Sequence, residues 1–159
     1  MIDKIVSLLE AKALTSNPKR VREIFQLRYI LEPEIAAIAS KSLSSKDLER
    51  IKVILETQEK GVLLDKEDAE EDLHFHMALV RATKNDVLVE MAAVLYDLLS
   101  ECRVPPLESM RRKELSLQGH KEIYAALRAE DPELSRISMR KHLQEVESLL
   151  FGHLKGSST

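Results

Sequence analysis

The sequence predicts an all-α fold, an antiparallel bundle of about six to seven helices. Two observations lead to this prediction. The chain has only four glycines and five prolines in 159 residues and is rich in residues that favour helix. Its apolar residues recur at spacings of three and four, and no stretch shows the sustained alternation of a half-buried strand. Each helix below follows from this periodicity and from the residues that begin and end it.

Size and charge limit the protein classes to which the chain can belong. At 159 residues with 44% hydrophobic residues, it suits one globular domain. The net charge is −3, so we expect no basic surface that would bind DNA directly. The single cysteine, Cys102, excludes an intramolecular disulfide and favours a reducing compartment. We find no signal peptide or membrane span, and we therefore predict a cytoplasmic protein.

The first half of the chain predicts three helices. Residues 1–17 form a linker-like helical segment, followed by the main domain over 18–155 and a disordered tail over 156–159. The second helix begins near Pro18, and Pro33 is expected to kink or end it. The third begins at Ser44, whose side chain can cap the free amides, and ends at Lys60-Gly61 with a left-handed glycine.

Four further helices are predicted in the second half. The helix over about 87–103 is very apolar and is expected to lie centrally, with Asn85 as its cap. The approximate ranges of the four helices are 65–83, 87–103, 108–128 and 131–153.

Four ionisable side chains occupy positions that should face the core. Asp72 and His76 are four residues apart, so they share one helix face, together with apolar neighbours. His120 precedes Ile123 by three residues, and His142 follows Met139 by three, so each also faces inward. Burying an imidazole or a carboxylate is unfavourable unless it gains a partner. One divalent metal, bound by Asp72, His76, His120 and His142, would supply a partner for all four.

A single inward histidine is more often satisfied by a carbonyl or water than by a metal. The prediction of a metal site therefore depends on all four residues together. Zinc, nickel or manganese would suit three nitrogens and one oxygen. His74 points about 200° around the helix from Asp72 and is expected at the surface or in a second layer around the site. His153 lies at a fraying helix end. Glu71 and His74 match half of a di-iron motif, but the chain has no second Glu-x-x-His sequence.

Short motifs stand out at intervals along the chain: LRYILEPEIAA at 27–37, DLHFH at 72–76, ATKN at 82–85, GHKEI at 119–123 and MRKHL at 139–143. Together they resemble the C-terminal effector-binding domain, of the FCD type, of FadR-type GntR transcription regulators. The resemblance covers roughly residues 18–152 and implies an antiparallel helical bundle. Members with the same Asp and His set hold a divalent metal in the bundle, which implies Asp72, His76, His120 and His142 here.

The resemblance also implies a function. Such domains bind a small carboxylate effector at open metal positions and form homodimers, and full-length members read DNA through an N-terminal winged helix-turn-helix. Only about 20 residues precede the first motif, too few for that domain. The chain is either a fragment or a stand-alone sensor, and its linker-like start favours the fragment.

Arg28 is the predicted effector-binding residue, because a guanidinium can hold a carboxylate through two hydrogen bonds. The alternative is an ion pair with Glu32, four residues on. Arg103 and Arg112 are weaker choices. We interpret the chain as a non-enzymatic, metal-dependent sensor of a small organic acid. A metal-dependent hydrolase is the rival interpretation, because such a site can also activate water, but no general base stands out.

Overall fold

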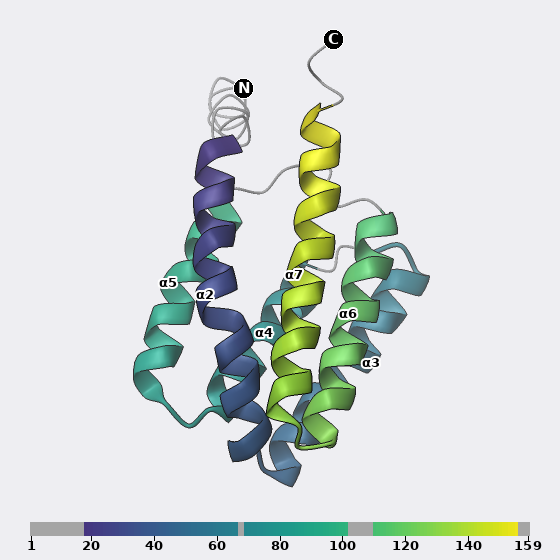
Figure 1. The fold of residues 1–159 in the computed structure, drawn as a ribbon. Helices are drawn as coiled ribbons and strands as arrows, with labels where there is room; N and C mark the ends of the chain where they lie inside the picture. The colour runs from purple at the N-terminus through teal and green to yellow at the C-terminus, as the bar shows by residue number, and fades with distance from the viewer. Residues whose placement is uncertain (1–17, 67–68, 102–109, 156–159) are drawn as a thin grey trace, which may run out of the picture.

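The computed structural model describes residues 18–66, 69–101 and 110–155 (Figure 1). These residues form six helices and no strand, which confirms the all-α prediction. The helices are α2 (Pro18–Ser42), α3 (Ser45–Leu63), α4 (Ala69–Ala82), α5 (Asp86–Glu101), α6 (Met110–Arg128) and α7 (Pro132–Lys155). The predicted segment over 1–17 and the tail over 156–159 lie outside the described residues.

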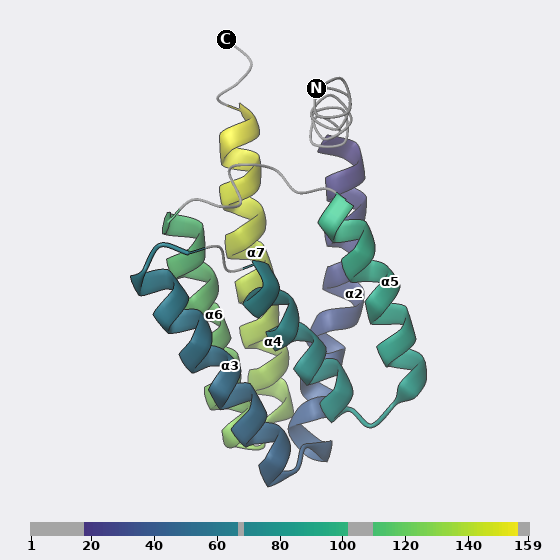
Figure 2. The same cartoon turned by 180° about the vertical axis from the view of Figure 1, so that it is seen from behind.

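The helices run up and down one long axis, so that sequence neighbours are antiparallel (Figures 1 and 2). Helices α2 and α7 form the most extensive contact, and α7 also packs against α6. Helix α3 packs against α4 and α6, and α4 contacts α2, α3 and α5. The start of α2 and the end of α7 lie at the same end of the bundle.

The central helix is α4, where the sequence predicted α5. All six consecutive residues 75–80 are buried, so α4 is covered on every side over this stretch. Helix α5 lies at the edge of the bundle, chiefly against α2 and α4. It exposes Val87 (68%), Met91 (51%) and Val94 (60%). The high apolar content of α5 therefore includes a face that this single chain leaves uncovered.

Helix α2 does not end at Pro33, and helix α3 does not end at Gly61. Helix α2 continues through Pro33 to Ser42, because the packing of α2 against its neighbours keeps the helical path although proline donates no hydrogen bond. Helix α3 passes Gly61 and ends at Leu63, and no glycine of the described chain has positive φ. The left-handed residue is Asp65, with φ of 49°, a conformation that aspartate tolerates.

The apolar core has a larger and a smaller part. The larger part lies among all six described helices and includes the fully buried Phe75, Leu79 and Ile123. The smaller part joins the start of α2 to the end of α7, through Phe25 and Leu150 among others. None of the described helices combines the length and apolar character needed to cross a membrane. Several polar side chains are nevertheless buried beside the larger part.

The start of α3 carries the predicted cap. The Ser44 hydroxyl accepts a hydrogen bond from the Asp47 amide at 3.2 Å, and the Asp47 carboxylate accepts one from the Ser44 amide at 2.7 Å. Lys84, in the turn after α4, binds the same carboxylate at 2.6 Å. The cap therefore also ties the start of α3 to the turn between α4 and α5.

We expect Ser44→Ala to lower the free energy of unfolding by about 1 kcal/mol, because the substitution leaves a helix amide without its acceptor. Urea unfolding followed by circular dichroism measures this. Ser45→Ala, one residue later on the exposed first turn, is the control and should change stability little. Equal losses in the two variants would contradict the capping role.

Candidate metal centre

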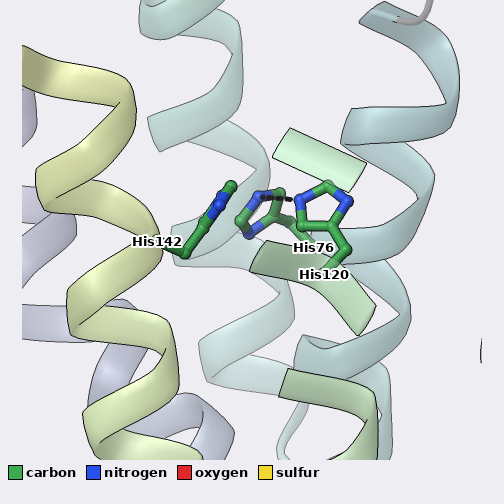
Figure 3. A group of neighbouring side chains, drawn as sticks. All are labelled: His76, His120 and His142. Atoms are coloured by element: carbon green, nitrogen blue, oxygen red, sulfur yellow. Dashed lines mark hydrogen bonds between the residues drawn. The ribbon is translucent and has the colours of Figure 1, made fainter. Parts of the chain in front are cut away.

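Three histidines from three helices meet in the core. His76 comes from α4, His120 from α6 and His142 from α7, and all three are buried. One ring nitrogen from each lies within 4.8 Å of the others. Figure 3 shows the rings gathered in the space between the helices. The structure thus brings together three of the four residues predicted as metal ligands into one group of suitable size.

Oxygen atoms lie beside Nδ1 of two of these rings. Nδ1 of His76 lies 2.8 Å from a carboxylate oxygen of Glu32, and Nδ1 of His120 lies 2.9 Å from the amide oxygen of Gln58. The two Nε2 atoms are 3.3 Å apart, within hydrogen-bond distance of each other. When both rings carry their hydrogen at Nδ1, beside these oxygens, each Nε2 presents a lone pair. In that tautomer two lone pairs face each other, which favours a cation between them.

His142 completes the group and depends on a glycine. Its Nδ1 is buried and makes no hydrogen bond within the described part of the chain. A Cβ at position 119 would lie 2.5 Å from this nitrogen, so α6 and α7 approach this closely only because residue 119 is glycine. Burial lowers the pKa of His142 and of His120 well below the usual value. Both rings are therefore neutral, which is the form that binds metals.

Asp72, the fourth predicted ligand, lies beside the three histidines. Its Oδ1 atom is 3.6 Å from Nε2 of His120, accepts a hydrogen bond from Ser116 at 2.7 Å and is 3.8 Å from Arg112. Burial alone would raise the pKa of this carboxyl, but Arg112 and the imidazoles outweigh it and hold the pKa well below its usual range. Asp72 is therefore ionised, and its side chain is 22% exposed.

Arg28, the predicted effector residue, forms a buried ion pair with Glu32. Its Nε is 2.5 Å from Oε1, and its second nitrogen NH2 is 3.4 Å from Oε2. Burial would raise the pKa of Glu32, but Arg28 and His76 together lower it to about 2. The structure thus contains the ion pair that the sequence offered as the alternative, and an effector role for Arg28 stays a prediction.

The remaining sequence candidates fall in different places. Arg112 is buried and lies next to Asp72, at the edge of the centre. Arg103 lies outside the described residues, as does the side chain of His153. The ring of His74 is 54% exposed beside Glu70, in agreement with the predicted surface position. Asn85 accepts a hydrogen bond from the Leu88 amide and caps α5 as expected.

Sequence reasoning missed the residues that hold the imidazoles. Gln58 is fully buried on α3 and lies seven residues after the buried Ile51, so it is a polar residue on an apolar helix face. Ser116 lies one turn before His120 and shares its face. Glu32 was noticed only as a partner for Arg28. The spacing alone could have found Gln58 and Ser116, but their partners lie on other helices.

Comparison with known proteins identifies the family of this chain. The FCD domain model matches residues 23–145. The regulator LutR of Bacillus subtilis is 30% identical over 150 residues, which cover 90% of this chain and 68% of LutR. The Uxu operon regulator of Haemophilus influenzae is 29% identical over 134 residues, 81% of this chain and 50% of that protein. The repressor NanR of Cronobacter sakazakii is 27% identical over 148 residues, which cover 91% of this chain and 57% of NanR.

Solved structures agree on the fold. A Streptococcus agalactiae GntR protein superposes with a TM-score of 0.71 at 22% identity, over 82% of this chain and 59% of that one. The Escherichia coli protein McbR/YncC superposes with a TM-score of 0.70 at 21% sequence identity, over 87% of this chain and 67% of that one. This chain spans about half to two thirds of the length of the sequence relatives. Those relatives are named as regulators, and the domain that they share is regulatory and not catalytic. The chain belongs to the FCD domain family, the effector-binding domains of GntR-type transcription regulators.

Proposed function

We propose that this domain senses a small organic acid through one divalent metal held by His76, His120, His142 and Asp72. The pair of Nε2 atoms of His76 and His120 carries the proposal. They are 3.3 Å apart, and an oxygen atom lies within 3 Å of Nδ1 of each ring, so that each ring can carry its hydrogen there. A metal ion would accept both lone pairs and would also give buried His142 a partner.

The donor set fits such an ion. Three imidazoles and one carboxylate are groups that zinc, nickel and manganese accept in proteins, and metal availability would decide among them. The ion would supply a positively charged centre to which an oxygen ligand can bind. The residues of this chain would orient the rings, and the buried position would limit water around them.

The charges around the centre favour an anionic effector. Arg28 and Glu32 cancel each other, and so do Arg112 and Asp72. A divalent ion would therefore add a charge of about +2 that no buried residue offsets, which is unfavourable in a low-dielectric core. A small carboxylate would reduce this excess. Its second anchor would be a guanidinium at the edge of the centre, Arg28 as proposed from the sequence or Arg112.

Signalling would follow from a shift between bundle geometries. The centre joins α4, α6 and α7, so an effector that binds one arrangement of these helices more tightly favours that arrangement. In the complete regulator, we propose that an N-terminal winged helix-turn-helix domain follows this change and binds DNA. Homodimers would form through the apolar face of α5, defined by Val87, Met91 and Val94.

We expect purified protein to bind about one divalent metal per chain and Gly119→Ala to bind it much more weakly, because the added Cβ would displace the ring of His142. Elemental analysis and a zinc competition titration measure this, with His142→Ala as the reference for lost binding. Gly61→Ala is the matched control. A Cβ at position 61 meets nothing within 4 Å, so that variant should bind metal normally and gain up to about 1 kcal/mol of stability. Unchanged metal content in both Gly119→Ala and His142→Ala would contradict the site.

We expect small acids with an α-hydroxyl or α-keto oxygen to raise the melting temperature of the zinc-loaded protein, whereas their neutral amides should not. At a hundredfold excess over Kd, binding stabilises the folded state by about 2.7 kcal/mol. Arg28→Lys and Arg112→Lys keep the local charge but lose the bidentate hydrogen bonding of a guanidinium. Each should therefore reduce the rise in melting temperature while the metal content stays intact. Arg111→Lys, on the exposed neighbour, should not. Stabilisation by amides or neutral sugars, and not by acids, would refute organic-acid sensing.

Light scattering should give twice the mass of a single chain at micromolar concentration, because the α5 face needs a cover. Val94→Glu should produce a monomer, since it places a charge in the middle of that face. Ile137→Glu alters an apolar residue on α7 of similar exposure, 54%, and should leave the dimer intact. A monomeric wild-type protein would show that the α5 face serves another purpose.

A further inference from the structure

An open groove between α3 and α4 is lined by both cationic and apolar side chains. Its volume is about 570 Å³, and the side chains that line it include Lys46, Arg50, Val53 and Ile54 from α3 and Ala78 and Arg81 from α4. The three cations are exposed, and none of them forms an ion pair with a residue that the structure describes. The acid Glu49 also lines the groove, but its carboxylate lies 3.9 Å from Lys52. The groove therefore keeps a positive charge, although the whole chain has a net charge of −3.

The lining of this α3–α4 groove indicates the chemistry of its occupant. Val53 is 51% exposed and Ile54 is half-buried, so the groove offers apolar surface beside its cations. An amphipathic helix can place its apolar side in such a groove. Acids next to that apolar side would neutralise the cations. The groove thus fits a helix that is both apolar and acidic.

Helix α5 of the same protein has this chemistry. Of its 16 residues, four are acidic and none is basic. At about 100° per residue, Glu90 and Asp97 both lie on the same flank of the exposed apolar face of α5. Both acids are exposed, and neither forms an ion pair within the described ranges of the chain. The α5 face and the groove therefore lack complementary partners in one copy of the chain and would supply them to each other between two copies.

The arrangement of the helices allows this contact only between copies. Helices α3, α4 and α5 lie on one side of the bundle, with α4 between the other two (Figure 2). Because α4 separates α5 from the groove, α5 cannot occupy the groove of its own chain. A two-fold dimer repeats every contact, so each copy can offer both its groove and its α5. Packing of α5 against the partner's α5 would instead bring two acidic helices together, which is unfavourable.

We propose that the α3–α4 groove binds α5 of a second copy of this chain and that the homodimer contains two such contacts. This inference rests on the homodimer proposed above, and it identifies the surface that the α5 face meets. The groove also connects the dimer to the candidate metal centre. His74, Ala78 and Arg81 of α4 line the groove, whereas Asp72 and His76 of the same helix lie at the centre. A displacement of α4 at the centre would therefore reach α5 of the partner.

Charge reversal at the two surfaces tests the proposal, with the dimer Kd measured by analytical ultracentrifugation. The double variant Arg50→Glu, Arg81→Glu makes the groove acidic, and the double variant Glu90→Lys, Asp97→Lys makes α5 basic. In either variant alone, like charges would face each other at both contacts, so the Kd should rise by about tenfold or more. An equimolar mixture of the two variants should form a heterodimer with a Kd within about threefold of the wild-type value, because each reversed surface then meets its complement.

A matched control reverses two cations that do not line the groove. Lys52→Glu with Arg140→Glu makes the same change in net charge at exposed positions of α3 and α7. This variant should keep the wild-type Kd. Circular dichroism confirms that every variant is folded, which is expected because all the substituted side chains are exposed.

The outcomes distinguish this inference from the proposed dimer itself. If Val94→Glu dissociates the dimer but the acidic groove leaves it intact, another surface covers α5, and the inference fails while the α5 dimer stands. Two folded variants that fail to pair with each other would also overturn the inference. A monomeric wild type would overturn both the inference and the dimer. Metal binding and the response to organic acids are measured separately and are decided by neither result.

Discussion

The centre depends on one constraint: polar side chains are buried in the bundle, and nearly all of them have hydrogen-bond or ion-pair partners. Arg28 with Glu32 and Arg112 with Asp72 balance their charges inside the bundle. The imidazoles of His120 and His142 are kept neutral by burial. Nδ1 of His142 is buried without a hydrogen-bond partner in the described part of the chain, and it lies beside the two Nε2 atoms of His76 and His120, which are 3.3 Å apart. Burial of a polar group without a partner is unfavourable, so this group of ring nitrogens indicates what the site should bind.

Local sequence predicted much of this arrangement because helix geometry is local. Asp72 and His76 share a face by their spacing of four, and His120 and His142 each follow the apolar period of their own helix. The caps at Ser44 and Asn85 likewise involve residues three positions apart. The all-α fold and the approach of the three histidines could therefore be predicted without any contact between helices being known.

The features that could not be predicted depend on contacts between helices, which the spacing of residues in the sequence does not reveal. Gln58 meets His120 across 62 positions, and Ser116 meets Asp72 across 44. Pro33 was expected to disturb α2, but the packing of that helix along its length outweighed the missing hydrogen bond. Helix α5 was placed centrally because it is so apolar. An apolar helix face predicts that another surface packs against it. It does not tell whether that surface belongs to the same chain or to another one.

The position of α5 and the construction of the centre are connected. In the proposed metal centre, ligands from α4, α6 and α7 would fix those helices relative to one another, so occupancy of the centre would act on the most deeply buried part of the bundle. Helix α5 contributes no ligand and rests on a few buried side chains, which makes it the helix most free to respond. Tyr96 of α5 is buried beside the centre, and its ring centroid is 5.8 Å from that of His76. A sensor needs a rigid site and a movable surface, and Tyr96 belongs to the movable helix while its ring lies beside the site.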